Sequence, residues 1–179
     1  NEELNYFDLN KSLYYYTLAS NLNHSQAQFN LGYIYYTGVV KRDINRAIHY
    51  FTLSANQNLV GAQYALGYIY ETGEFTSRDI VKSIYYYTLA ANQNHPMSQF
   101  SLGLIYSKDK HLMDYSIYYY TLAANQNNVG AQKTLGWFYF QGIYVQKDVQ
   151  KAIYYLSQAS NQNDEEAQYG LGLIYFITE

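Results

Sequence analysis

The sequence contains no cysteine, a single proline and no long apolar run. Without cysteine the chain forms neither disulfides nor thiolate metal sites, although both oxidising and reducing compartments remain compatible with it. No stretch reaches the roughly 18 consecutive apolar residues that a transmembrane helix requires. Because proline breaks helices and marks turns, one proline in 179 residues indicates that long loops are few.

The sequence also lacks a dominant charge. It has 11 Lys and Arg against 14 Asp and Glu, a formal net charge of -3, and neither a basic run nor an acidic tail. Binding to nucleic acid or to a membrane surface through charge is therefore not expected. The hydrophobic fraction of 49% is normal for a globular protein and predicts a packed core.

One unit is repeated along the chain. The string Ala-Gln-x-x-Leu-Gly occurs four times, and a fifth copy has Ser in place of Ala. Its leucines are separated by 35, 36, 33 and 36 residues, at Leu31, Leu66, Leu102, Leu135 and Leu171. A second string, close to Ile-Tyr-Tyr-Tyr-Thr-Leu-Ala-Ala-Asn-Gln-Asn, lies between these copies. Two alternating segments in such a period indicate a two-helix repeat.

Both segments have the periodicity of a helix. In the first segment Ala27, Leu31 and Ile34 follow the spacing i, i+4, i+7, and the second segment repeats that spacing from Ala47. Gly32 and its equivalents lie in the middle of the first helix, where Gly is less favourable than Ala by roughly 1 kcal/mol. Five repetitions of that cost predict that a partner helix packs where a side chain would otherwise lie.

Capping residues mark the expected helix ends. Left-handed residues commonly terminate helices, and the candidates are Gly38, Gly73 and Gly142 after the first helix and Asn58, Asn94, Asn127 and Asn163 after the second. An aspartate precedes each second helix, where its carboxylate can accept the free backbone N–H groups. These predicted N-caps are Asp8, Asp43, Asp79, Asp114 and Asp148.

These capping residues predict ten helices, with a lone helix over Leu9–Leu22 at the start and another over Glu165–Phe176 at the end. We expect a single domain that consists of a half-repeat over 1–23, full repeats over 24–58, 59–94, 95–127 and 128–163, and a half-repeat over 164–179. Because the series starts and ends out of phase, and its last helix is apolar where solenoids carry polar caps, we expect a section of a longer solenoid.

The recurring pattern Ala-x-x-x-Leu-Gly-x-x-Tyr, then Gly, then Asp, then Ala-x-x-Tyr/Phe and a closing Ala, resembles the Sel-1-like repeat, a relative of the tetratricopeptide repeat. In the second pair it reads Ala62, Leu66, Gly67, Tyr70, Gly73, Asp79, Ser83, Tyr87 and Ala90. The third unit departs from it, because Ser107-Lys108-Asp109-Lys110 replaces the Gly, and we expect a differently shaped loop there. The resemblance implies an all-α, right-handed superhelical solenoid of antiparallel helix pairs that acts as an adaptor or scaffold.

Signatures of catalysis are missing from the sequence. No His-Glu-x-x-His, Gly-x-Ser-x-Gly or phosphate-binding Gly-rich loop occurs. His24 and His95 occupy equivalent places two repeats apart, so they are not expected to converge on one metal ion and are interpreted as solvated loop residues. We therefore predict a non-enzymatic segment without metal or cofactor.

By the resemblance, the first helix of each pair lines a concave surface, which solenoids use for binding. The exposed positions would lie two residues before, two after and five after each repeat leucine, and they are strongly aromatic. Tyr and Trp are enriched in binding hot spots. The predicted partner-binding residues are Phe29, Tyr33, Tyr36, Tyr64, Tyr68, Phe100, Lys133, Trp137, Phe140 and Tyr169, with Trp137 as the strongest single candidate. The alternative is that several of them pack between repeats as core.

The expected partner is a protein or peptide, and two other functions stay open. One is a structural subunit of a large assembly, contacted through the tyrosine runs Tyr14–Tyr16, Tyr85–Tyr87 and Tyr118–Tyr120 of the second helices. The other is a regulatory repeat domain of a larger enzyme. The 25 tyrosines also fit a codon bias toward A and T, in which case the runs carry no function.

Overall fold

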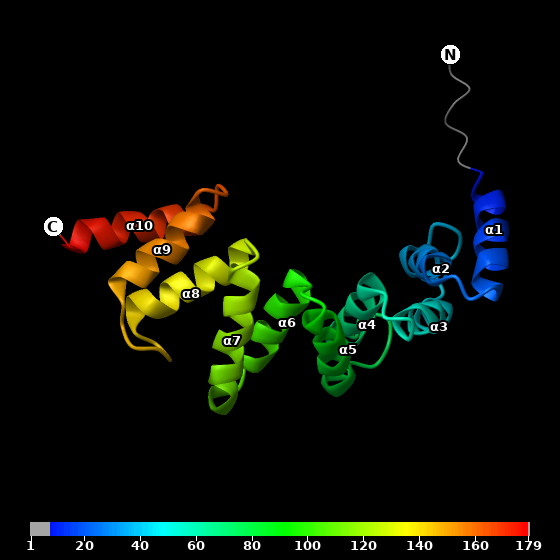
Figure 1. The fold of residues 1–179 in the computed structure, drawn as a ribbon, viewed down its shortest axis with the longest axis horizontal. Helices are drawn as coiled ribbons and strands as arrows, with labels where there is room; N and C mark the ends of the chain where they lie inside the picture. The colour runs from blue at the N-terminus through cyan, green and yellow to red at the C-terminus, as the bar shows by residue number, and fades with distance from the viewer. Residues whose placement is uncertain (1–7, 179) are drawn as a thin grey trace, which may run out of the picture. The chain divides into compact units, whose positions relative to one another are not determined.

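The computed structural model describes residues 8–178 of the chain (Figure 1). This part contains ten α-helices, one short 3₁₀ helix over Lys110–Leu112 and no strand. The α-helices are α1 Leu9–Asn21, α2 Ser25–Thr37, α3 Ile44–Ala55, α4 Val60–Thr72, α5 Ile80–Asn92, α6 Pro96–Tyr106, α7 Met113–Ala124, α8 Val129–Gln141, α9 Val149–Ser160 and α10 Glu165–Thr178. The predictions of ten helices and of an all-α helical solenoid are confirmed.

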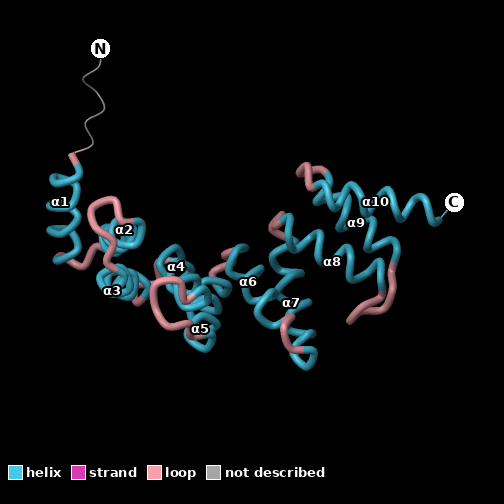
Figure 2. Tube along the Cα trace, turned by 180° about the vertical axis from the view of Figure 1, so that it is seen from behind, coloured by secondary structure: helices cyan, strands magenta, loops and turns pink. Residues whose placement is uncertain are grey.

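The chain divides into two compact units, the first ending at Ala90 and the second beginning at Ala91. In each unit helices of the first type (α2 and α4; α6, α8 and α10) alternate with helices of the second type (α1, α3 and α5; α7 and α9), and short loops join them (Figure 2). Within the units, α2 packs against α3, α6 against α7, and α8 against α9. The helix pair predicted from the two alternating strings is therefore the repeating element.

Four of the five predicted aspartate caps are confirmed. Each carboxylate accepts the backbone N–H three residues on, at 2.9–3.0 Å, in the pairs Asp8–Lys11, Asp43–Arg46, Asp79–Lys82 and Asp148–Lys151. The predicted left-handed residues have positive φ as well: 77°, 62° and 69° at Gly38, Gly73 and Gly142, and 61–64° at Asn58, Asn94, Asn127 and Asn163.

The prediction for Asp114 is wrong, because α7 already begins at Met113 and Asp114 lies in its first turn. This shift of the helix start arises in the connection between α6 and α7, which lacks the glycine found in the other repeats. Ser107 stays right-handed there, and the chain makes a 3₁₀ turn whose start is capped by Asp109, which accepts the His111 N–H at 2.9 Å. The expectation of a differently shaped third loop is confirmed.

The mid-helix glycines bring first and second helices together. A Cβ at Gly32 would lie 2.7 Å from the Phe51 ring, and one at Gly103 would lie 2.5 Å from the Tyr120 ring. Gly67 with Tyr87 and Gly136 with Leu156 repeat this packing. The predicted helix approach is thus confirmed at four glycines. At the fifth, Gly172, nothing lies within 4 Å of a Cβ in the described structure.

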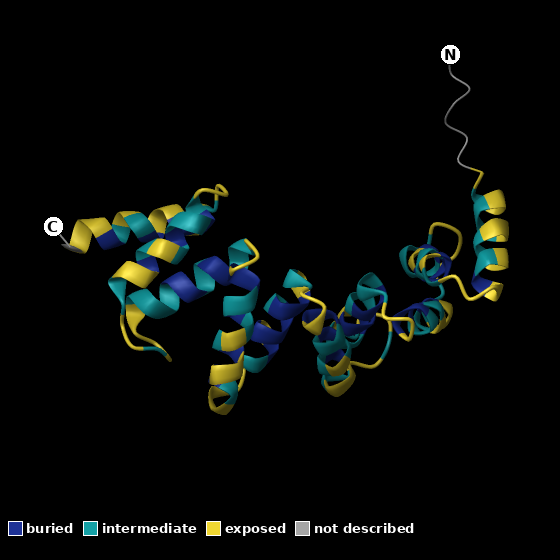
Figure 3. Cartoon of the chain, viewed as in Figure 1, coloured by how far each residue is buried: buried dark blue, intermediate teal, exposed yellow. Residues whose placement is uncertain are grey.

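Figure 3 shows buried residues on the sides of the helices that face their neighbours, and some of them are polar. Gln28, Gln63, Gln99 and Gln132 are buried, and each side-chain amide donates to the carbonyl eight residues earlier, at 3.2–3.4 Å. Three of them also accept a bond of 2.7–2.9 Å from a glutamine that follows a second helix, in the pairs Gln57–Gln28, Gln126–Gln99 and Gln162–Gln132. These buried amides are therefore satisfied, as burial requires.

Candidate functional site

An apolar pocket of about 240 Å³ opens on the first-type helices of unit 1. Its lining consists of Phe29, Tyr33 and Tyr36 from α2, Phe51 from α3, and Gly61, Tyr64, Ala65, Tyr68 and Ile69 from α4. Five of the ten residues predicted to bind a partner are in this lining. The structure thus brings together residues from two successive repeats that the sequence pattern could place only one helix at a time.

The floor of the pocket consists of rings packed on one another. Phe51 is buried, and its ring centroid lies 5.6 Å from that of Phe29 and 6.5 Å from that of Tyr36. Phe29 also lies close to Gly61, where an added Cβ would be 3.3 Å from its ring. The glycine therefore lets the Phe29 ring approach α4 closely, and this contact forms one wall.

The mouth of the pocket is formed by two exposed tyrosines, Tyr33 (54% exposed) and Tyr68 (40%). Desolvation raises the pKa of Tyr36 and of Tyr64 above the ordinary tyrosine value, and the neighbouring Tyr68 adds to both shifts. Both phenols are protonated at neutral pH, as an ordinary tyrosine is. The pocket therefore offers an uncharged aromatic surface.

A second pocket, of about 280 Å³, lies on the other side of α2. It is lined by Leu9, Ser12 and Tyr16 from α1, by Asn30, Tyr33 and Ile34 from α2, and by Val39. Tyr33 belongs to both linings and separates the two pockets. We call the two pockets together, with Tyr33 between them, the tyrosine surface.

In unit 2 the corresponding residues make contacts within the repeat stack. Phe100 packs on Tyr120 with centroids 5.7 Å apart, and a Cβ at Gly130 would lie 2.7 Å from its ring. Lys133 forms ion pairs with Asp164 (3.2 Å) and Glu166 (2.6 Å), and these hydrogen-bonded carboxylates raise its pKa. Lys133 therefore links α8 to the start of α10.

Trp137 and Phe140 pack against the core cluster of α9 and α10. Their rings meet edge to face at 5.8 Å, and a Cβ at Gly170 would lie 3.2 Å from the indole. Tyr169 is 65% exposed. For Trp137 and Phe140 the structure therefore shows the packing role that the sequence left open as an alternative.

The tyrosine runs divide into three environments. In Tyr85–Tyr87 the first side chain is exposed, Tyr86 stacks on Tyr70 with centroids 6.0 Å apart, and Tyr87 is buried. The run Tyr118–Tyr120 repeats this order, with Tyr119 stacked on Tyr106 at 5.8 Å. In these two runs two of every three tyrosines therefore serve packing, whereas in Tyr14–Tyr16 the first two side chains are exposed.

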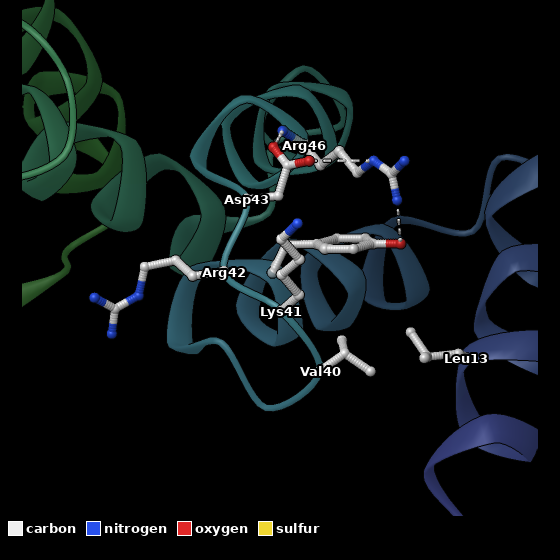
Figure 4. A pocket seen from close by; sticks show the side chains of 7 residues that line it. Leu13, Val40, Lys41, Arg42, Asp43 and Arg46 are labelled. Atoms are coloured by element: carbon white, nitrogen blue, oxygen red, sulfur yellow. Dashed lines mark hydrogen bonds and ion pairs between the residues drawn. The ribbon is translucent and has the colours of Figure 1, made fainter.

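A polar pocket of about 350 Å³ lies at the connection between α2 and α3 (Figure 4). Arg46 donates to the Tyr35 hydroxyl at 3.3 Å and pairs with Asp43 at 3.4 Å, as the dashed lines in Figure 4 show. Arg42 points away from them and stacks 4.4 Å above the Phe75 ring. A pocket lined by Tyr139, Asp148 and Lys151, among others, occupies the equivalent place before α9. Pockets of this kind therefore form at the connection between the first and the second helix of a repeat.

The histidines have a structural role that the sequence interpretation missed. Nδ1 of His24 accepts the Ala27 N–H, and Nδ1 of His95 accepts the Ser98 N–H, each at 3.2 Å, so both residues cap first-type helices. Over residues 8–178 no cluster of three or more His, Asp or Glu could hold a metal ion. Nor does any helix in that range have the length and apolarity needed to cross a bilayer.

Comparison with known families gives one match that extends over most of the chain. The profile described as Sel1 repeat matches at residues 8–24, 25–59, 60–95, 96–128, 130–164 and 165–177. No curated protein matches the sequence.

Several solved structures share the fold. The crystal structure of c5321, a protective antigen of uropathogenic Escherichia coli with an SLR fold, is 29% identical, with a TM-score of 0.84 over 91% of this chain and 36% of that one. A Sel1 repeat protein from Oxalobacter formigenes is also 29% identical, with a TM-score of 0.80 over 90% of this chain and 48% of that one. The immunity protein Pa5087 from Pseudomonas aeruginosa, 21% identical, has a TM-score of 0.54 over 87% of this chain and 59% of that one. This chain thus spans about a third to a half of the length of the first two.

Proposed function

The chain belongs to the Sel1 repeat family, and on that premise we propose that it holds a segment of a partner protein on the tyrosine surface. Sel1-repeat proteins are generally scaffolds for protein interaction, and their fold is typically not catalytic. The observation that carries the proposal is the apolar pocket whose lining contains five of the predicted binding residues.

The size and chemistry of the pocket support a protein ligand over a small molecule. Its volume of about 240 Å³ is below the roughly 300–1,000 Å³ typical of small-molecule sites. A pocket of that size takes one large side chain, and side chains that fill pockets between aromatic residues are the usual hot spots of protein interfaces. Tyr33 and Tyr68 add exposed area with a polar tip.

Affinity capture from the native source tests this proposal. Tyr33→Ala and Tyr68→Ala should each weaken capture of the main partner by about tenfold or more, a hot-spot effect of roughly 2 kcal/mol. The helical circular dichroism should not change, because both side chains are exposed. Capture is quantified by mass spectrometry against the wild-type chain.

Tyr85→Ala is the matched control, since Tyr85 is 59% exposed in the same unit but lies on a second-type helix. It should retain full capture. If Tyr85→Ala loses the partner and the two pocket variants keep it, the tyrosines of the second helices are the binding surface and the proposal is wrong. Trp137→Ala is a poorer probe, because Trp137 packs on Gly170 and its loss also removes packing.

A further inference from the structure

We propose that the start of α6 is an acid-sensitive switch, in which protonation of His95 at mildly acidic pH releases the first turn of the helix. Histidine is the side chain whose charge ordinarily changes in this pH range. The switch goes beyond the proposed function and does not depend on the tyrosine surface. It follows from the hydrogen bonds of the imidazole, from the burial of the groups that the ring holds and from the lack of a compensating charge around it.

The cap of α6 requires an unprotonated ring nitrogen. The backbone N–H of Ser98 donates to Nδ1 of His95 at 3.2 Å, and the Ser98 hydroxyl lies 2.9 Å from the same nitrogen. A backbone N–H can only donate, so Nδ1 must accept and the neutral ring carries its proton on Nε2. A second proton can add only at Nδ1, where it removes the acceptor. Protonation of His95 and capping of α6 therefore exclude each other.

The groups held by this cap are buried. Ser98 is fully buried, and a buried donor that loses its acceptor is costly. A protonated imidazole would also place positive charge at the N-terminus of a helix, where the helix dipole disfavours cations. α6 has no acidic residue in its first turn to offset that charge. Both effects favour movement of the protonated ring out of its place and opening of the first turn.

The segments that meet the start of α6 offer no compensating charge. Residues 91–94 and residues 121–132 each contain a group bonded to the Gln99 side chain, and neither segment has a titratable side chain. Lys133, which follows the second segment, pairs with carboxylates at the start of α10. α6 itself contains no charged residue. A protonated His95 therefore finds no carboxylate in these segments.

The sign of the pH dependence follows from the burial of the ring. Burial lowers the pKa of His95 below the ordinary histidine value. In the opened chain the imidazole returns to that ordinary pKa, about 6.5. Because the opened chain binds the proton more strongly, the helix start has its full stability above about pH 6.5 and loses it as the pH falls through the lowered pKa. Acid therefore opens the switch.

His24 repeats the arrangement at the start of α2 in a weaker form. Its Nδ1 accepts the Ala27 N–H at 3.2 Å, and the first turn of α2 has no acidic residue. Residues 18–23, which precede it, and residues 52–58, which bond to Gln28, contain no titratable side chain. His24 is exposed, whereas His95 is half-buried. We therefore expect a smaller effect of pH at α2.

An equivalent helix of the same chain has a cap that acid leaves intact, and it supplies the internal control. α8 begins after Asn128, whose side-chain oxygen accepts the Ala131 N–H at 2.9 Å. An amide carries no titratable proton at these pH values. The N–H groups of Ser98 and Ala131 thus occupy the same position in two helices, one under a histidine and one under an asparagine.

Hydrogen exchange of single amides, followed by NMR with the whole chain at about pH 7.5 and about pH 5.5, tests the switch. The protection factor divides the intrinsic exchange rate by the observed one, so the direct effect of pH on exchange cancels. The protection of the Ser98 amide should fall about five- to tenfold at the lower pH. Tenfold is about the limit that linkage sets for a group with a pKa near 6.5 in the open form. The Ala131 amide should change less than about twofold.

Two histidine variants assign the effect. His95→Asn gives α6 the cap of α8, and the protection of the Ser98 amide should then be the same at both pH values within about twofold. His111→Asn is the matched control, since His111 lies in the 3₁₀ helix and its backbone N–H, not its ring, forms the bond with Asp109. This variant should keep the response of the wild-type chain.

Equal protection of the Ser98 amide at the two pH values overturns the proposal. So does a response that survives His95→Asn, because another group would then cause it. A measurement on the wild-type chain alone is the ¹⁵N NMR spectrum of the imidazole at about pH 7.5. It should show an unprotonated Nδ1 for His95, and a proton on that nitrogen would also overturn the proposal, even if His95→Asn failed to fold.

Discussion

At the scale of single residues, the structure assigns opposite roles to identical residue types. Gly32 leaves room for the buried Phe51 ring, whereas Gly172 has open space where a Cβ would lie. Likewise Tyr87 is buried and Tyr85 exposed, although they are two residues apart in one helix. The role of a residue here depends on which neighbouring helix it faces. Substitutions at equivalent positions should therefore have opposite effects on the stability of the protein.

Gly32→Ala and Gly172→Ala test this directly. The new methyl at residue 32 would lie 2.7 Å from a buried ring, and overpacking of this kind costs about 1–3 kcal/mol. At residue 172 only the better helix propensity of Ala remains, which should stabilise by up to about 1 kcal/mol. Urea unfolding followed by circular dichroism measures both changes; stabilisation by Gly32→Ala would contradict the packing described.

The pair Lys133 and Phe100 shows why the candidate surface could be predicted only in part. Both residues stand two positions before a repeat leucine, as Phe29 and Tyr64 do. Their surroundings depend on a residue about 30 positions later in the next first-type helix: Gly130 beneath Phe100 and Glu166 beside Lys133. Phe29 has the same kind of partner in Gly61, so Phe29 and Phe100 pack alike, whereas Lys133 forms ion pairs. The pattern within one repeat contains no information about this partner.

At the scale of helices, the caps decide where each element begins. Asp148 accepts the N–H of Lys151 at 2.9 Å and starts α9, whereas Asp114 occupies the equivalent place in the sequence but lies inside α7. The helices and most of their ends could be predicted from the sequence because Asp, Gly and Asn act locally, within about four residues. The start of α7 could not, because the 3₁₀ turn over Lys110–Leu112 leads directly into the helix and places Leu112 at its N-cap.

Substitution of these two aspartates separates true caps from apparent ones. Asp148→Ala should lower the free energy of unfolding by about 1 kcal/mol, the usual cost of a lost N-cap. Asp114→Ala should cost only a few tenths of a kcal/mol, since an acidic residue in the first turn contributes through the helix dipole alone. Denaturant midpoints of the two variants give the comparison, and equal losses would mean that Asp114 also caps α7.

At the scale of the whole molecule, the buried glutamines are the polar feature common to successive repeats in both units. Gln132 is representative: it donates to the Ala124 carbonyl at 3.2 Å and to Gln158 at 3.0 Å, and it accepts from Gln162 at 2.9 Å. Gln168 occupies the same place in α10 but is exposed. The difference indicates that these glutamines stabilise the stack only where a neighbouring repeat covers them.

Replacement of these two glutamines by leucine tests that view. Gln132→Leu removes the partner of a buried carbonyl and of two side-chain amides, which should cost about 1–3 kcal/mol. Gln168→Leu should change stability by less than about 0.5 kcal/mol, as surface substitutions usually do. Chemical unfolding of both variants at one protein concentration provides the measurement, and a neutral Gln132→Leu would show that the buried network contributes little.

The pairing of four mid-helix glycines with a large side chain of the following helix also defines how the array can be recombined. Gly32 and Phe51, like Gln28 and Gln57, lie between one left-handed asparagine and the next. Across Asn58 the hydrogen bond of the buried glutamine goes to a backbone carbonyl, which any residue provides, whereas the packing of Phe29 against Gly61 depends on the side chains. Whole modules exchanged, deleted or duplicated at these asparagines would keep each mid-helix glycine with its partner side chain, provided that the next module supplies the glycine that Phe29 or Phe100 packs against. A splice between the two helices of a module would separate the glycine from its partner.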